Sequence, residues 1–147
     1  MASKRQNTPA FVPWYRGSDI PFRVIRAFAR RVAERFQPER IILFGSYAYR
    51  QPHADSDVDI LVVMPARNQL DQAVHIELAC EPCFPLDIIV RTPKNMRWRL
   101  EEGDSFLREI VSRGKILYEK AHEGVGAKSG SRLSSRRKTP PGKRSTS

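Results

Sequence analysis

Apolar residues early in the chain recur with the period of an α-helix. Over residues 20–36 they return every three or four positions, so one face of a helix would be apolar and could be buried. Most positions between them are basic: Arg23, Arg26, Arg30, Arg31 and Arg35. We expect this helix to end before Pro38, with a basic face that is either solvated or binds phosphate or a partner.

Four short apolar runs predict β-strands at residues 40–44, 57–64, 86–90 and 116–118. Further helices are expected at 70–79 and 92–100, and from a cap at Asp104 to residue 112, with Gly114 ending the last one. A short helical segment is expected at 47–50, followed by a loop at 51–56. Helices and strands are thus mixed within one small domain, which predicts an α/β or α+β fold with helices packed on a short sheet.

Three aspartates interrupt the second and third of these apolar runs. Asp57 and Asp59 project to the same face of a strand because side chains alternate, and Asp87 would join them if the third strand lies alongside. Like charges held this close in apolar surroundings do not all stay ionised without a cation. Oxygen-only ligation by carboxylates suits Mg²⁺, so Asp57, Asp59 and Asp87 are the candidate metal ligands.

Gly45 and Ser46 follow the first predicted strand and precede the short helical segment. A glycine turn that leads into a helix start offers backbone N–H groups and a hydroxyl, and such an end binds phosphate oxygens. Gly45 and Ser46 are therefore candidate phosphate-binding residues. Because they adjoin the segment that carries Asp57 and Asp59, the phosphate and metal sites would be neighbours.

The spacing of these residues resembles that of the polymerase-beta-type nucleotidyltransferase superfamily. The shared features are Gly45-Ser46, a ten-residue spacer, the pair Asp57-x-Asp59, Asp87 on a later strand and the closing pattern FLREIVSRGKILYE. They cover residues 20–118, and the minimal nucleotidyltransferases are the most similar group, some of which act as antitoxins beside HEPN toxins. The resemblance implies a small mixed sheet flanked by helices, like the polymerase-beta palm, with two Mg²⁺ ions and a nucleoside triphosphate.

The resemblance also implies a reaction, the transfer of AMP from ATP to an acceptor hydroxyl with release of pyrophosphate. Asp57 and Asp59 would hold both Mg²⁺ ions. Asp87 would be a further ligand and would accept the proton of the attacking hydroxyl. Gly45 and Ser46 would bind the β- and γ-phosphates.

Positions 49 and 50 depart from the family pattern. Many relatives read GSxARG, whereas this chain reads GSYAYR, so Tyr49 replaces an arginine and Arg50 replaces a glycine. If position 50 adopts a left-handed conformation, arginine there costs about 1 kcal/mol relative to glycine. Arg50 is kept as a candidate phosphate-binding residue, and the loop over the triphosphate is expected to differ in shape from that of relatives.

A protein side chain is the expected acceptor. Small-molecule nucleotidyltransferases of this superfamily generally hold the acceptor in a second domain, and this chain has only short helices after Val90 and then a polar tail. We therefore expect AMPylation of a HEPN-type partner, docked on the apolar patch 11–15 or on the basic helix face. Two alternatives are an antitoxin that acts by binding with little catalysis, and an aminoglycoside-type small-molecule nucleotidyltransferase.

Much of the formal net charge of +10 on the 147 residues lies in the C-terminal tail. Residues 128–147 contain seven Lys or Arg and no Asp or Glu, and they lack the apolar residues that offset the entropy of ordering. The predicted organisation is an N-terminal extension at 1–17, a nucleotidyltransferase domain at 18–119 and a disordered basic tail at 120–147. Nucleic acid would bind only through this tail.

Cys80 and Cys83 form a single CxxC with no second pair to complete a zinc site, so they are expected to be core or surface thiols. No signal peptide opens the chain, and no apolar run reaches the roughly 18 residues of a membrane span. The sequence therefore predicts neither secretion nor a membrane partner, and a reducing cytoplasm is the expected compartment.

Overall fold

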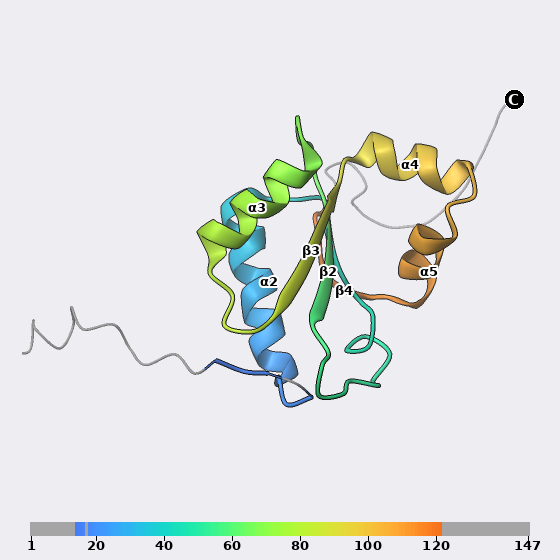
Figure 1. Ribbon diagram of the computed structural model, residues 1–147. Coiled ribbons are helices and arrows are strands. Elements are labelled where there is room, and N and C mark those ends of the chain that lie inside the picture. The colour runs from blue at the N-terminus through green and yellow to red at the C-terminus, as the bar shows by residue number, and fades with distance from the viewer. Residues whose placement is uncertain (1–13, 17, 122–147) are drawn as a thin grey trace, which may run out of the picture.

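A four-stranded mixed sheet lies between two pairs of helices (Figure 1). The computed structural model describes residues 14–16 and 18–121. The strands are β1 (Arg40–Phe44), β2 (Val58–Val63), β3 (Leu86–Arg91) and β4 (Lys115–Glu119), in the order β3-β2-β1-β4. β1 is antiparallel to β2 and β4, whereas β2 and β3 are parallel. The predicted small mixed sheet flanked by helices is confirmed.

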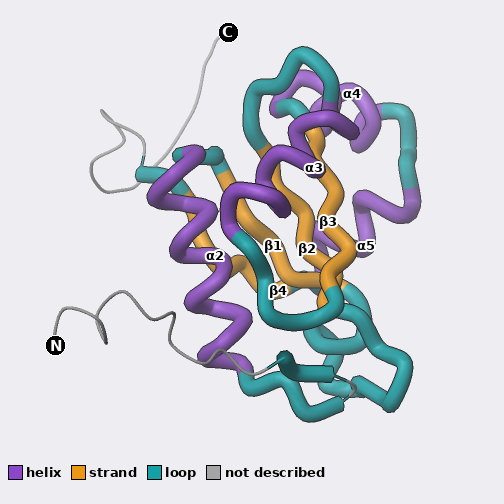
Figure 2. Tube along the Cα trace, turned by 60° about the vertical axis from the view of Figure 1, so that its left-hand side comes forward, coloured by secondary structure: helices purple, strands orange, loops and turns teal. Residues whose placement is uncertain are grey.

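Each face of the sheet is covered by two helices (Figure 2). The helices α2 (Phe22–Phe36) and α3 (Gln69–Cys80) cover one face, and α4 (Pro93–Glu101) and α5 (Ser105–Arg113) cover the other. The alternation of side chains along β2 divides the core accordingly. Ile60 belongs to the cluster under α2 and α3, whereas Leu61 packs with α4 and α5. Asp59 projects to the same side as Leu61, toward α5.

Two predicted boundaries near the aspartates were wrong. The segment 47–50 is a single turn, in which the N–H groups of Ala48 and Tyr49 both donate to the carbonyl of Gly45, at 3.0 and 3.1 Å. It cannot continue as a helix because Arg50 is left-handed, with φ of 61°. The second strand begins at Val58, whose N–H donates to the carbonyl of Pro85 at 2.9 Å, so Asp57 precedes the strand.

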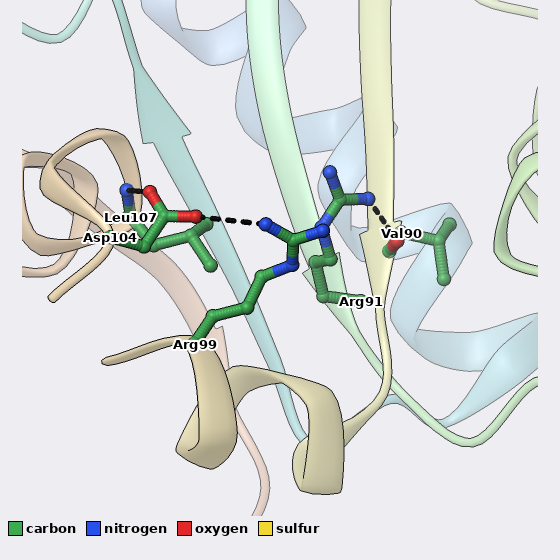
Figure 3. A network of polar contacts seen from close by, with 5 residues as sticks. All are labelled: Val90, Arg91, Arg99, Asp104 and Leu107. Atoms are coloured by element: carbon green, nitrogen blue, oxygen red, sulfur yellow. Dashed lines mark hydrogen bonds and ion pairs between the residues drawn. The ribbon is translucent and has the colours of Figure 1, made fainter. Parts of the chain in front are cut away.

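Asp104 links α4 and α5 (Figure 3). Its carboxylate accepts from the N–H of Leu107 at 3.0 Å, as the predicted helix cap, and from the guanidinium of Arg99 in α4 at 3.1 Å. The Leu107 N–H is the main cause that holds the pKa of Asp104 below its usual range, and Arg99 adds to it. α5 ends at Gly114, as predicted. These contacts fix the start of α5 relative to α4.

The arginines of the basic face of α2 fall into two groups, one in contact with α3 and one lining a hollow beside β4. Arg31 and Arg35 reach across to α3 and donate to the carbonyls of Cys80 and Ala79, at 3.1 and 3.2 Å. These carbonyls belong to the last turn of α3, where cations are favourable. Two other side chains of this face, Arg26 and Arg30, line a hollow of about 450 Å³ beside β4. This hollow is lined by none of the candidate aspartates.

Cys80 is buried and Cys83 is partly buried, and both are free thiols. Burial raises the pKa of the Cys80 thiol. Cys80 therefore acts as a core residue, as predicted.

The apolar patch 11–15 and the tail from residue 122 onward fall largely or wholly outside the described residues, so predictions about them stay untested. None of the helices within residues 14–16 and 18–121 has the length and apolar character needed to cross a bilayer.

Candidate active site

Asp59 and Asp87 are directly paired on neighbouring parallel strands. Paired residues of a parallel ladder project to the same face, so the two carboxylates leave the sheet side by side. Asp59 is partly buried, whereas Asp87 is exposed on β3, which is an edge strand. Asp57, two residues before Asp59, is exposed at the end of the loop that enters β2. The structure thus brings the three predicted carboxylates to one end of the β2–β3 pair.

The pKa of Asp59 shows that it is unfavourable for Asp57, Asp59 and Asp87 all to be ionised this close together. Its pKa is raised to about 6, first by burial and then by the negative charges of Asp87 and Asp57. Each of these causes disfavours the charged form of Asp59. A cation bound among the carboxylates would relieve the repulsion.

Gly45 provides the opposite wall of the site. The preceding residue, Phe44, is paired with Asp59 across the β1–β2 ladder, and Gly45 then turns the chain with φ of 75°. A β-carbon at position 45 would overlap the Asp59 carboxylate. Glycine is therefore required here both by the backbone conformation and by the close approach of the carboxylate.

Ser46 is held by a serine that sequence reasoning missed. Its hydroxyl donates to the hydroxyl oxygen of Ser56 at 3.0 Å, and Ser56 also accepts from the N–H of His53 at 2.7 Å. Ser56 has only 5% of its surface exposed and is the one buried polar residue in the described part of the chain. It closes the loop that joins Ser46 to Asp57. Its only sequence signal is its position directly before the Asp57-x-Asp59 pair.

Arg50 lies at the end of the turn and is exposed. Its φ of 61° confirms the left-handed conformation that the family glycine had indicated. The N–H of Gln51 donates to the carbonyl of Ser46 at 2.8 Å and closes the turn behind Arg50. The role of Arg50 in phosphate binding stays a prediction.

A pocket of about 280 Å³ opens beside Gly45 and Asp59. Its other lining residues are Phe44, Tyr49, Phe106, Glu109 and Ile110. Phe106 packs edge-to-face on Phe44, with ring centroids 5.6 Å apart. Sequence reasoning did not assign the α5 residues to the site, although positions 106, 109 and 110 have the spacing of one helix face.

The residues fit a divalent cation in chemical type. The donors are carboxylate oxygens, which Mg²⁺ prefers, and Gly45, which has no side chain, lets the Asp59 carboxylate lie against the glycine turn beside the pocket that both residues line. As they stand, no three His, Cys, Asp or Glu side chains among the described residues converge closely enough to ligate one ion. An ion would therefore have to draw the exposed carboxylates of Asp57 and Asp87 toward Asp59.

Comparisons with known proteins find one matching family model and similar solved structures. The family model described as "Nucleotidyltransferase domain" matches residues 25–117, which include the three aspartates and the glycine turn. The solved structure of a candidate nucleotidyltransferase from Sulfolobus solfataricus is similar, with 20% identity, a TM-score of 0.47, and coverage of 67% of this chain and 79% of that one. A mutant of the toxin–antitoxin MntA–HpeT has 20% identity, a TM-score of 0.40, and coverage of 69% and 75%. A search of curated proteins finds no match.

Proposed function

The chain belongs to the nucleotidyltransferase domain family, and from this premise we propose that it transfers AMP from ATP to a hydroxyl of a partner protein. The observation that carries the proposal is the pairing of Asp59 with Asp87 in front of the Gly45 turn. Asp59 and the Gly45 turn line the same pocket, and a phosphate-bearing substrate with its cation needs both an acid and backbone N–H groups.

Each residue of the site has a role in this reaction. Asp57, Asp59 and Asp87 would hold Mg²⁺, and the Gly45-Ser46 turn would hold the β- and γ-phosphates. When bound, Mg²⁺ neutralises phosphate charge and makes the acceptor hydroxyl more acidic. The chain itself contributes alignment, because its pocket holds the triphosphate in one orientation.

The chemical step is a displacement at the α-phosphorus of the nucleotide. The acceptor oxygen forms a bond to the α-phosphorus, and the bond between that phosphorus and the oxygen bridging to the β-phosphate breaks. Pyrophosphate leaves with the electron pair of the broken bond. The proton of the hydroxyl passes to the carboxylate of Asp87, which is exposed and therefore accessible to an acceptor arriving from outside.

The surroundings of Asp87 support a protein as the acceptor. Asp87 lines a groove of about 370 Å³ along the free edge of β3, and the other wall of this groove includes Leu70 of α3. Beyond the groove α3 exposes a stripe formed by Leu70, Val74 and Leu78, at 75%, 52% and 73% of their surfaces. An open apolar surface beside the proposed proton acceptor suits a protein better than a small polar acceptor. A HEPN-type protein carrying a Tyr or Ser hydroxyl is the partner we propose.

Labelled nucleotides test the reaction. The protein is incubated with Mg²⁺ and each of the four nucleoside triphosphates, labelled in turn at the α- and the γ-phosphate, in the presence of a co-expressed HEPN-type partner or an aminoglycoside. We expect α-label on the partner, no γ-label, one pyrophosphate per transfer and an intact mass raised by one AMP. Asp59→Asn is the inactive control. Label on the aminoglycoside alone would overturn the protein acceptor, and absence of transfer to any acceptor would overturn the activity.

A further inference from the structure

The pocket beside Asp59 lacks a positive charge of its own. Among the seven described residues that line it, two are acidic, Asp59 and Glu109, and none is Lys, Arg or His. The proposed substrate brings several negative charges on its phosphates into this pocket. Even with a divalent cation bound at the aspartates, the end of the pocket formed by Glu109 would repel a phosphate.

Arg113, the last residue of α5, stands at the rim of this pocket. Its guanidinium lies over the ring of Tyr49, with the central carbon 4.0 Å from the ring centroid. It also forms an ion pair with Glu109 at 3.0 Å. Tyr49 and Glu109 both line the pocket, so Arg113 is in contact with two of its walls.

The backbone of Arg113 is fixed relative to the glycine turn. The next residue, Gly114, donates its N–H to the carbonyl of Ile110 at 2.8 Å. A β-carbon on Gly114 would lie 2.6 Å from the side chain of Ile42 and 3.0 Å from the carbonyl of Leu43. The end of α5 is thus seated directly on β1, the strand that leads into Gly45.

The side chain of Arg113 is able to change partners. It is 57% exposed, and its ion pair with Glu109 joins two exposed groups, so little energy opposes its separation. The contact with Tyr49 is made with the face of its ring, and the N–H group that donates to Glu109 would become available to another oxygen when that ion pair separates. Phosphate oxygens match the guanidinium fork in geometry and in charge.

We propose that Arg113, held over Tyr49, is the residue that binds the phosphates of the nucleotide at the rim of the pocket. It would exchange Glu109 for a phosphate when the substrate enters. Tyr49, which stands where many relatives have an arginine, would support the guanidinium of Arg113 in this role. The assignment rests on the proposed nucleotidyl transfer and adds a specific cation to it.

Nucleotide binding by variants of Arg113 and Tyr49, including one in which the two residues are exchanged, tests this assignment. The α,β-methylene analogues of the four nucleoside triphosphates are titrated with Mg²⁺ into the wild-type protein by calorimetry, and the tightest is then used with the variants. Arg113→Ala should weaken binding by about ten-fold or more, and Arg113→Lys by less. The double variant Tyr49→Arg, Arg113→Tyr should recover most of the loss. The corresponding nucleoside, which has no phosphate, should bind all variants equally.

Arg108→Ala is the matched control. Arg108 is exposed on the same helix and donates to the carbonyl of Leu100, away from the pocket, so its loss should leave nucleotide binding unchanged. Wild-type binding that Arg113→Ala leaves intact would overturn this inference alone. Equal losses for nucleotide and nucleoside in Arg113→Ala would also overturn it, since they would show a disturbed helix. Wild-type protein that binds no analogue would overturn the proposed function as well.

Discussion

The backbone of Gly45 lies directly against the carboxylate of Asp59, so that any side chain at position 45 would occupy the space of the carboxylate. The contact follows from strand register, because Phe44 and Asp59 are paired and the chain turns at the next residue. The glycine of the turn is thus required by the acid of the neighbouring strand. The residues that we propose for phosphate binding and for metal binding are therefore in contact here.

Gly45→Ala should therefore abolish nucleotidyl transfer and destabilise the fold. Residue 45 has φ of 75°, and the added methyl group would also displace the Asp59 carboxylate. We expect a loss of about 2 kcal/mol or more in the free energy of unfolding, measured by urea denaturation, together with loss of nucleotide binding.

Gly103→Ala is the matched control for this change. Gly103 has φ of 91°, but a β-carbon there would meet no atom within 4 Å. It should show only backbone strain, of about 1 kcal/mol, with unchanged nucleotide affinity. If the two variants behaved alike in both assays, the contact with Asp59 would have no special role.

Asp59→Asn should stabilise the protein more at pH 8 than at pH 4. The folded-state pKa of Asp59, about 6, lies above its ordinary value near 4, so the folded state binds more protons between these values. Stability from this group is therefore fully present below about pH 4 and is lost as pH rises through about 6. The full shift corresponds to about 3 kcal/mol, but solvent screening of this partly exposed group reduces the expected gain to about 1 kcal/mol.

Urea denaturation of wild type and variant at both pH values measures this gain. Adding Mg²⁺ at pH 8 should stabilise the wild type and not the variant, since an ion that binds only the folded state shifts the equilibrium toward it. A pH dependence that the substitution leaves unaltered would show that neither burial nor the neighbouring carboxylates raise the pKa of Asp59 in the folded protein.

Sequence patterns predicted the strands well, because apolar runs and the glycine and proline residues that end them are local signals. The ladder places Asp87 beside Asp59 in register, as expected from two strands that each carry an acid near the start. The cap at Asp104 and the end of α5 at Gly114 were likewise predictable, because each depends on a few neighbouring residues.

Contacts made at long range could not be predicted in this way. The exclusion of a side chain at Gly45 depends on the exact position of Asp59, fourteen residues later. The contact between Arg113 and the Tyr49 ring joins the end of α5 to a turn that is distant in sequence, and no periodicity in the sequence relates these two residues. The helix predicted at 47–50 was wrong because the left-handed residue Arg50 closes the segment after one turn; the glycine of relatives indicated that conformation, whereas arginine itself gives no local signal of it.

Arg50→Gly should stabilise the protein by about 1 kcal/mol, because Arg50 is held at a φ of 61° that glycine adopts without strain. Arg50→Ala removes the same charge but retains the strain, so it should give no such gain. The two variants are compared by urea denaturation and by nucleotide titration. If the charge of Arg50 contributes to phosphate binding, both should lose affinity equally. A loss in Arg50→Gly alone would instead mean that loop rigidity controls affinity.

Asp87→Ala should retain nucleotide binding better than Asp57→Ala or Asp59→Ala while losing the chemical step. Asp87 is exposed on the edge strand, at the side from which we propose that the acceptor approaches, whereas the partly buried Asp59 and its neighbour Asp57 remain to hold the cation. Calorimetry with Mg²⁺ and nucleotide gives the affinity, and pyrophosphate release gives the rate. Equal loss of affinity in all three variants would remove the separate role assigned to Asp87.

Ser56→Ala should weaken both the fold and nucleotide binding, although Ser56 contacts no substrate in the proposed reaction. Its buried hydroxyl accepts from the N–H of His53 and from the hydroxyl of Ser46, and alanine would leave both donors without this partner. We expect a loss of about 1–3 kcal/mol in the free energy of unfolding and a lower affinity for nucleotide, because the loop that carries Ser46 is no longer held. Ser105→Ala, at an exposed position, should change neither quantity. A Ser56→Ala protein with wild-type affinity would show that the turn keeps its shape without the serine pair, and that backbone bonds such as that from Gln51 to Ser46 hold it alone.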